Sequence, residues 1–264
     1  MSNATRPTPL RPNRLPGVSE AEWELRTRLA GAYRIADHLG WSEAIYAHIT
    51  VRVPGPDHHF LINPYGLRYD EVTASNLVKV ELDGTIVGDS DYPVNPAGFI
   101  IHSAVHQARG DARCVFHTHT TEGMAIAAQQ QGLLPISIMA SGFYDRVAYH
   151  DYEGPTMRAD EQERLVASLG AHKVLILRNH GLLTTGATLE EAFINMFRLQ
   201  RACEIQVAAQ AGGAALVIPS QSVCEDAARM ADEFLHDTSG DDLGKPEFDA
   251  YLRHIDKLDS SYRD

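Results

Sequence analysis

Apolar residues recur at helical spacing near the start of the chain, three or four positions apart from Leu25 to Leu39. This spacing predicts an amphipathic helix over residues 20–39. Ser19 and Glu22 stand three positions apart at its start and form a predicted capping box, in which each side chain accepts a hydrogen bond from the backbone N–H of the other residue. The pattern therefore gives this helix both a buried face and a defined first turn.

Short apolar stretches, some of them alternating with polar residues, predict strands further along the chain, and helical spacing predicts helices between them. The strands are expected within residues 46–55, 59–66, 77–88, 114–120 and 173–181. The helices are expected within residues 95–110, 121–132, 157–170 and 189–213, with one more before the C-terminal tail. Strands that alternate with helices, with a hairpin signal in the first half, predict an α/β fold in which helices cover a mixed sheet.

Proline spacing and polar content divide the chain into three parts. The prolines between Pro7 and Pro16 predict a flexible N-terminal arm over residues 1–18. We find no internal repeat and no linker in the middle of the chain, so residues 19–237 are expected to form a single domain. Residues 238–264 are expected to form a polar C-terminal tail.

Composition narrows the functional classes. The 264 residues include 35 acidic and 23 basic side chains, which give a formal net charge of −12. An acidic chain argues against a nucleic-acid-binding protein, since binding phosphates requires a basic surface. No apolar run approaches the roughly 18 residues that cross a bilayer. We therefore expect no membrane binding. The cysteines Cys114, Cys203 and Cys224 have no CxxC spacing, so we expect reduced thiols in a cytoplasmic protein.

Histidines follow two of the predicted buried strands. His117 and His119 are two positions apart at the end of one strand, so their side chains point to the same face. His180 follows a second buried strand and is followed directly by Gly181. Three imidazoles from two strand ends can converge on one divalent ion with water positions left open, as in catalytic zinc sites. The spacing alone also allows partly exposed histidines at strand ends without a metal.

The segments "FHTHT" and "NHGLLTTG" together resemble the class II aldolase/adducin family, and the resemblance extends over about residues 25–215. It implies an α/β/α sandwich with a central mixed or antiparallel sheet between helical layers. It also implies that His117, His119 and His180 bind a divalent cation: Zn, with Mn, Fe, Co or Ni as alternatives. The resemblance further implies a homotetramer with active sites at the subunit interfaces.

The chain departs from the sugar-phosphate aldolases of this family before the histidine pair. Those aldolases have a "PSSE" segment, whose glutamate is a metal ligand and proton carrier and whose serines bind the substrate phosphate. The matching segment here is "NPAGFIIH", with Gly98 in place of the glutamate and Pro96 and Ala97 in place of the serines. The segment is more similar to the adducin side of the family. The resemblance therefore implies that this chain is no sugar-phosphate aldolase.

Two further aldolase segments also differ. The Gly-Asn at a strand entry becomes Ala47-His48, and "TPSG" becomes the segment from Asn63 to Gly66. From the matched positions and the chemistry of the side chains, we expect substrate contacts from His48, Asn63, Gly66, Gly98 and Arg178. For His48 the alternative is a hydrogen bond to backbone at the strand entry, and for Arg178 it is a place at the surface.

The residues and the resemblance predict a divalent-metal-dependent lyase of the aldolase or decarboxylase type. It would act on a small, non-phosphorylated oxo or hydroxy carboxylate through a metal-stabilised enolate. Tyr144, Tyr149 and Glu122 are the candidates for proton transfer. Alternatively, the tyrosines pack a subunit interface, and Glu122 is an ordinary acidic residue in the first turn of a helix.

Two other functions remain open at this point. One is a non-catalytic, adducin-like assembly or binding protein, favoured by Gly98 and the segment around it. The other is a non-haem iron oxygenase, because three histidines can also hold iron with open coordination positions. The retained histidines favour the lyase.

Overall fold

The structure is a computed structural model that describes residues 15–55, 58–154, 160–239 and 242–264. Its centre is one sheet with the strand order β3-β2-β1-β4-β7-β6-β5. The strands are β1 His48–Arg52, β2 Phe60–Ile62, β3 Val78–Val80, β4 Cys114–Thr118, β5 Val147–His150, β6 Val174–Leu177 and β7 Gly181–Gly186. The β5–β6 pair is parallel and the other pairs are antiparallel, so the predicted mixed sheet is confirmed.

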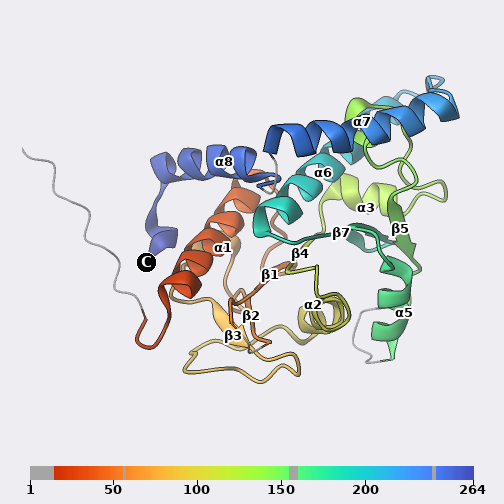
Figure 1. The fold of residues 1–264 in the computed structure, drawn as a ribbon. Helices are drawn as coiled ribbons and strands as arrows, with labels where there is room; N and C mark the ends of the chain where they lie inside the picture. Colours follow the sequence, from red (N-terminus) through yellow and green to blue (C-terminus); the bar gives the residue numbers. More distant parts are fainter. Residues whose placement is uncertain (1–14, 56–57, 155–159, 240–241) are drawn as a thin grey trace, which may run out of the picture.

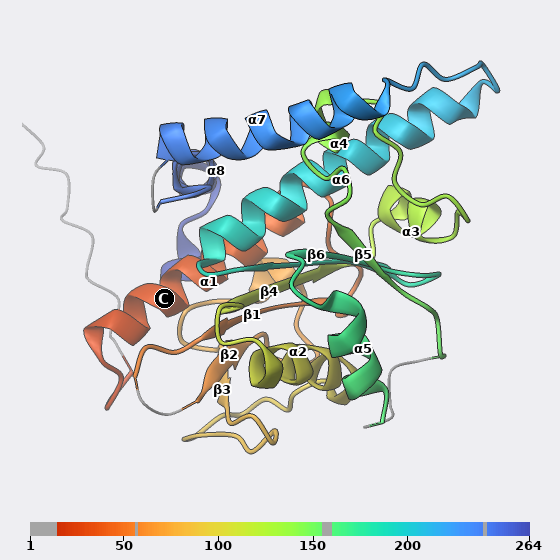
Figure 2. The same ribbon diagram turned by 45° about the vertical axis from the view of Figure 1, so that its right-hand side comes forward.

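Helices cover both faces of the sheet (Figures 1 and 2). They are α1 Glu20–His38, α2 Pro96–Ala108, α3 Thr121–Ala127, α4 Ile138–Ser141, α5 Glu161–Leu169, α6 Leu189–Ala211, α7 Gln221–Ser239 and α8 Lys245–Leu258, with short 3-10 turns at Tyr69–Glu71 and Ser261–Arg263. Figure 2 shows α2 and α5 on one side of the sheet and α1, α6 and α8 on the other. The predicted α/β/α sandwich is therefore confirmed.

The residues of β4 divide between the two layers of core. Cys114 and Phe116 pack into the large apolar cluster formed with α1 and α6, whereas Val115 packs into the cluster formed with α2 and α5. Because alternate residues of a strand point to the same face, His117 shares the α2 side of the sheet with Val115. His117 thus lies at the end of this buried layer, and the residue is only 3% exposed.

The Ser19 half of the predicted capping box is present, while the Glu22 carboxylate accepts hydrogen bonds from Arg26 and Lys79; α6 has an N-cap of the same kind at Thr188. The Ser19 side chain accepts a hydrogen bond of 3.1 Å from the Glu22 N–H, and Thr188 accepts one of 3.1 Å from the Glu191 N–H at the start of α6. Each bond satisfies a backbone donor that has no partner within its helix.

Two segments differ from the sequence-based expectations. The stretch predicted as one strand over residues 173–181 contains β6 and then a sharp turn, and β7 begins at Gly181. Asn179 in this turn has a φ of 56°, and asparagine tolerates this left-handed conformation better than most residues. β5 was not predicted, because it is short and alternates between buried and half-buried residues at the edge of the sheet.

The C-terminal segment differs as well. Residues 238–264 were expected to be a polar tail, yet they contain α8, whose Phe248, Leu252 and Ile255 belong to the large core cluster. These apolar residues are spaced three or four apart, so they form one face of a helix although polar residues dominate the segment. The expected N-terminal arm lies mostly outside the described residues.

Candidate metal centre

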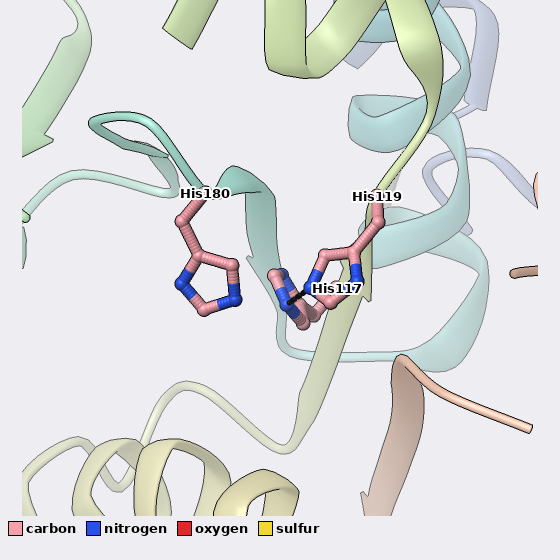
Figure 3. A group of neighbouring side chains, drawn as sticks. All are labelled: His117, His119 and His180. Carbon is pink, nitrogen blue, oxygen red and sulfur yellow. Dashed lines mark hydrogen bonds between the residues drawn. The ribbon is translucent and has the colours of Figure 1, made fainter. Parts of the chain in front are cut away.

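The three predicted histidines meet at one end of the β4–β7 strand pair. β4 and β7 are antiparallel, with Thr118 opposite Leu182, so the end of β4 lies beside the start of β7. His119 follows β4 and His180 directly precedes β7. Their rings and that of His117 point toward one another (Figure 3), with ring centroids 4.6 to 4.9 Å apart. One nitrogen of each ring lies within 4.8 Å of the corresponding nitrogens of the other two.

Hydrogen bonds determine which ring nitrogens carry protons. His117 Nδ1–H donates to the Leu182 carbonyl over 2.8 Å, and His119 Nδ1–H donates to Glu43 Oε2 over 2.5 Å. In a neutral imidazole the other nitrogen is then an acceptor. The Nε2 atoms of His117 and His119 are 2.8 Å apart. Two lone pairs at this distance repel each other unless a proton or a metal cation lies between them.

Burial disfavours the proton. It lowers the pKa of His117 well below its usual value, and positive charge on His119 or His180 would lower it further. Burial, followed by the influence of His119 and His150, lowers the pKa of His180 to about 4. These two rings are therefore neutral at physiological pH, which is the form that binds metals.

The donor set fits a divalent ion. With Zn–N bonds of about 2.0–2.1 Å, tetrahedral coordination places ligand nitrogens roughly 3.3 Å apart. This value lies between the 2.8 Å of the closest pair and the 4.8 Å limit of the whole group. Three imidazole ligands would leave further coordination positions open for water or substrate.

Gly181 allows the two strand ends to approach each other. A Cβ atom at this position would lie 2.4 Å from the Thr118 carbonyl oxygen and 3.1 Å from His119 Cδ2. A larger residue would thus push the start of β7 away from the histidine pair. The lack of space for a side chain explains why a glycine follows His180 in the sequence.

Glu43 is a site residue that the sequence did not indicate. It lies in the loop between α1 and β1, and its carboxylate accepts the hydrogen bond from His119. The two residues are 76 positions apart, and no local motif links them. Carboxylates commonly hold the second nitrogen of a metal-binding histidine in this way.

Gly98 and His48, both predicted to contact substrate, lie against each other. A Cβ atom at Gly98 would be only 1.8 Å from His48 Cδ2 and 2.0 Å from Nε2. His48 Nδ1–H donates to Asn63 Oδ1 over 2.9 Å, and Nε2 accepts from Asn95 Nδ2 over 3.3 Å. Burial lowers the pKa of His48 to about 4, so the ring is neutral. His48 pairs with His117 across β1 and β4, which places this group next to the triad.

Three of the other candidates pack within the protein. Arg178 donates hydrogen bonds to the carbonyls of Gln129 and Gln130, and its guanidinium lies 4.1 Å from the centroid of the Tyr149 ring. The Tyr149 hydroxyl accepts a hydrogen bond from the Leu133 N–H. Glu122, in the first turn of α3, accepts one from Gln200. These contacts fit structural roles at least as well as catalytic ones.

The last two candidates lie apart from these contacts. Tyr144 lines a cavity of about 170 Å³ together with Tyr149, and burial raises the pKa of the Tyr144 hydroxyl. Gly66 is exposed and has a φ of 105°, a conformation that favours glycine. No described contact joins either residue to the three histidines.

Comparison with known proteins identifies the family of this chain. The model of the family described as "Class II Aldolase and Adducin N-terminal domain" matches residues 27–207. The chain belongs to this family. The predicted resemblance is thus confirmed, and membership of the class II aldolase superfamily supports a metal-dependent lyase at the coarse level.

Relatives come from both sides of the class II aldolase and adducin family. A solved structure of an aldolase II superfamily protein from Pseudomonas syringae is 49% identical, covers 94% of this chain and 98% of its own, and has a TM-score of 0.89. L-fuculose 1-phosphate aldolase from Glaciozyma antarctica is 29% identical, with coverage of 95% and 97% and a TM-score of 0.79. Alpha-adducin of Mus musculus is 48% identical over 89% of this chain, which spans 33% of that longer protein.

Class II aldolases depend on a divalent metal, and the histidine triad of this chain provides a fitting donor set. Among the described residues, this triad is the group of metal-binding side chains that lie close enough to share one ion. None of the helices in the described parts of the chain is both long and apolar enough to cross a membrane.

Proposed function

We propose that this protein is a divalent-metal-dependent lyase, of the decarboxylase or aldolase type, that acts on a small non-phosphorylated oxo or hydroxy carboxylate. One observation carries the proposal: three imidazoles converge on one point, and Gly98 of α2, beside the neighbouring His48, has no room for a side chain. A site without a carboxylate ligand keeps more positive charge for an anionic substrate.

A divalent ion held by His117, His119 and His180 would polarise a substrate carboxylate and an adjacent oxygen and stabilise negative charge as a C–C bond breaks. The residues around it contribute shape and orientation. His48 occupies the space beside Gly98 and is held by Asn63 and Asn95. No ligand from this turn of α2 therefore competes with the substrate for the open coordination positions.

The same segment supports a non-phosphorylated substrate. Pro96 has no side-chain donor, and Gly98 has no side chain at all. His48 is neutral, and Asn95 already donates to it. A phosphate dianion needs donors or cations that match its charge, and this segment offers few. A carboxylate that binds through the metal does not need them.

The finer assignments are part of this proposal. Zinc is the expected metal, with Mn, Fe, Co or Ni as alternatives, and the expected assembly is a cytoplasmic homotetramer. Tyr144, Tyr149 or Glu122 would donate the proton after cleavage, and Arg178 and Gly66 would lie at the margin of the substrate site. In a tetramer, Tyr144 could serve a neighbouring subunit's site, since no described contact joins it to His117, His119 or His180.

The test combines metal analysis with a ligand series. The purified protein is analysed for bound metals, stripped with a chelator and reloaded. Calorimetry then compares 2-oxo and 2-hydroxy acids with sugar phosphates of similar size, and product analysis identifies lyase activity. We expect carboxylates to bind only to the metal-loaded protein and more tightly than phosphates. Tighter binding of phosphates would refute the proposed substrate class.

An adducin-like assembly role is the second candidate, because alpha-adducin is 48% identical over most of this chain. A protein of this kind needs no metal. If the stripped protein shows no affinity for divalent ions and keeps its oligomeric state, the assembly role replaces the lyase. Oxygen consumption that requires Fe(II) would point to the oxygenase instead.

A further inference from the structure

We infer that Glu43 is a positioning residue of the metal site, and that the loop from Trp41 to His48 is built to hold its carboxylate against His119. The inference rests on the metal site of the proposed function and goes beyond its three ligands. It assigns the negative charge near the site to Glu43, which is separated from the metal position by the His119 ring, while Gly98 of α2, beside His48, has no side chain.

The contact has the geometry that a metal-binding histidine requires. Glu43 Oε2 lies 2.5 Å from His119 Nδ1, so the carboxylate accepts the Nδ1 proton and leaves Nε2 as the metal-binding atom. The same ring without this acceptor could carry its proton on either nitrogen. A carboxylate partner also increases the electron density on Nε2, which strengthens the bond to the metal.

The loop is fixed at both ends. Trp41 is buried against Phe116 and Phe193 in the core. At the other end, His48 begins β1 and pairs with His117. Between them, the Tyr46 N–H donates to the Glu43 carbonyl over 2.8 Å, which closes a tight turn. The backbone of Glu43 is therefore held beside His119, and the bond to His119 positions the carboxylate, although the Glu43 side chain is 45% exposed.

Backbone strain in this loop supports a functional role. In the described parts of the chain, the non-glycine residues with positive φ are Ala44, Ala47, Asp145 and Asn179. Ala44 follows Glu43 and Ala47 precedes His48, while Asn179 precedes His180. Such conformations cost about 1–2 kcal/mol for a residue with a Cβ and persist where the surrounding structure imposes them, often at functional sites. Three of the four thus adjoin the metal centre.

The role predicts a specific loss when the charge is removed. Glu43→Gln keeps the size of the side chain and an oxygen acceptor but removes the negative charge, and Glu43→Ala removes the acceptor as well. We expect affinity for Co(II) and Zn(II) to fall about 10–100-fold in Glu43→Gln, and at least as far in Glu43→Ala. The exposed Glu24→Gln on α1 is the matched control and should bind both ions like the wild type.

The experiment measures Co(II) and Zn(II) affinity of the stripped full-length protein by chelator competition, together with the d–d absorption of the Co(II) form. ¹⁵N NMR of the metal-free form, in which no cation fixes the tautomer, reports the protonated ring nitrogen of His119. We expect Nδ1–H in the wild type, altered Co(II) bands in Glu43→Gln, and loss of the fixed tautomer in Glu43→Ala. If Glu43→Ala does not fold, Glu43→Gln decides.

Unchanged affinity and spectrum in Glu43→Gln would overturn the assignment of Glu43, while the proposed function would stand because the wild type still binds metal. If the wild type itself binds neither ion, the proposed function and this inference fall together. The two failures are therefore distinguishable.

Discussion

The contact between Gly98 and His48 leads to a quantitative prediction. In Gly98→Ala, the new methyl group would lie 1.8 Å from His48 Cδ2, whereas nonbonded carbon atoms approach to about 3.5–4.0 Å. The ring or the start of α2 must therefore move by roughly 1.7 Å. Overpacking of this kind costs about 1–3 kcal/mol. If the ring moves, its hydrogen bonds to Asn63 and Asn95 weaken, at about 0.5–1.5 kcal/mol each.

A double-mutant cycle isolates this contact. His48→Ala alone should cost about 2–4 kcal/mol, since it removes a buried ring and its hydrogen bonds. Once the ring is absent, the three atoms nearest to a methyl group at position 98 are gone. We therefore expect the double variant to be nearly as stable as His48→Ala, which gives a coupling of about 2 kcal/mol.

Urea unfolding followed by circular dichroism measures the four free energies of unfolding. Gly110→Ala provides a control for the glycine change, because a Cβ there would meet nothing within 4 Å. It should change stability by less than about 1 kcal/mol. Additive effects of Gly98→Ala and His48→Ala would show that the ring does not occupy the space beside Gly98, and the steric part of our reasoning would fail.

Three further predictions concern the ligands, the strained loop and the buried histidines. His180→Ala should lower Zn(II) affinity at least 100-fold, measured by chelator competition, because two imidazoles seldom hold the ion alone; an unchanged affinity would exclude His180 as a ligand. Ala44→Gly should raise the free energy of unfolding by about 0.5–1 kcal/mol, because glycine adopts a φ of 49° without strain. Ala167→Gly within α5 is the control and should lower it by a similar amount. Thermal melts in which both variants change stability in the same direction would contradict the proposed strain at Ala44. Burial lowers the pKa of His106 from 6.5 to about 3. The unfolded chain therefore takes up a proton below pH 6.5 that the folded one does not, so stability is lost as the pH falls from 6.5 toward 3. Relative to His106→Gln, the wild type should lose about 2 kcal/mol more between pH 7.5 and 5 in urea titrations, and parallel pH profiles would refute this.

The sequence was sufficient for the parts of the site that follow local rules. A strand places every second residue on one face, so His117 and His119 could be paired from their spacing. A helix cap depends on residues three positions apart, so Ser19 was found correctly as the N-cap of α1. His180 was connected to the pair by its place after a buried strand and by the family resemblance.

Other features depend on contacts that no local pattern records. The Glu43–His119 bond joins residues 76 positions apart and arises only from the path of the loop before β1. The turn between β6 and β7 was missed because apolar residues lie on both sides of it, so the two strands read as one. Arg178 stacks on the Tyr149 ring, a contact that the sequence did not indicate, and its expected contact with substrate stays a prediction.

The way β4 meets β7 has a consequence for how the chain acquires a metal. The hydrogen bond from His117 to Leu182 spans 65 residues, so the donor atoms converge only after distant parts of the chain have paired. A divalent ion bound by all three rings thus prefers the native state and stabilises it by mass action, by about 2.7 kcal/mol when free metal exceeds its dissociation constant 100-fold. Heat resistance should consequently depend on the metal supply of the cell.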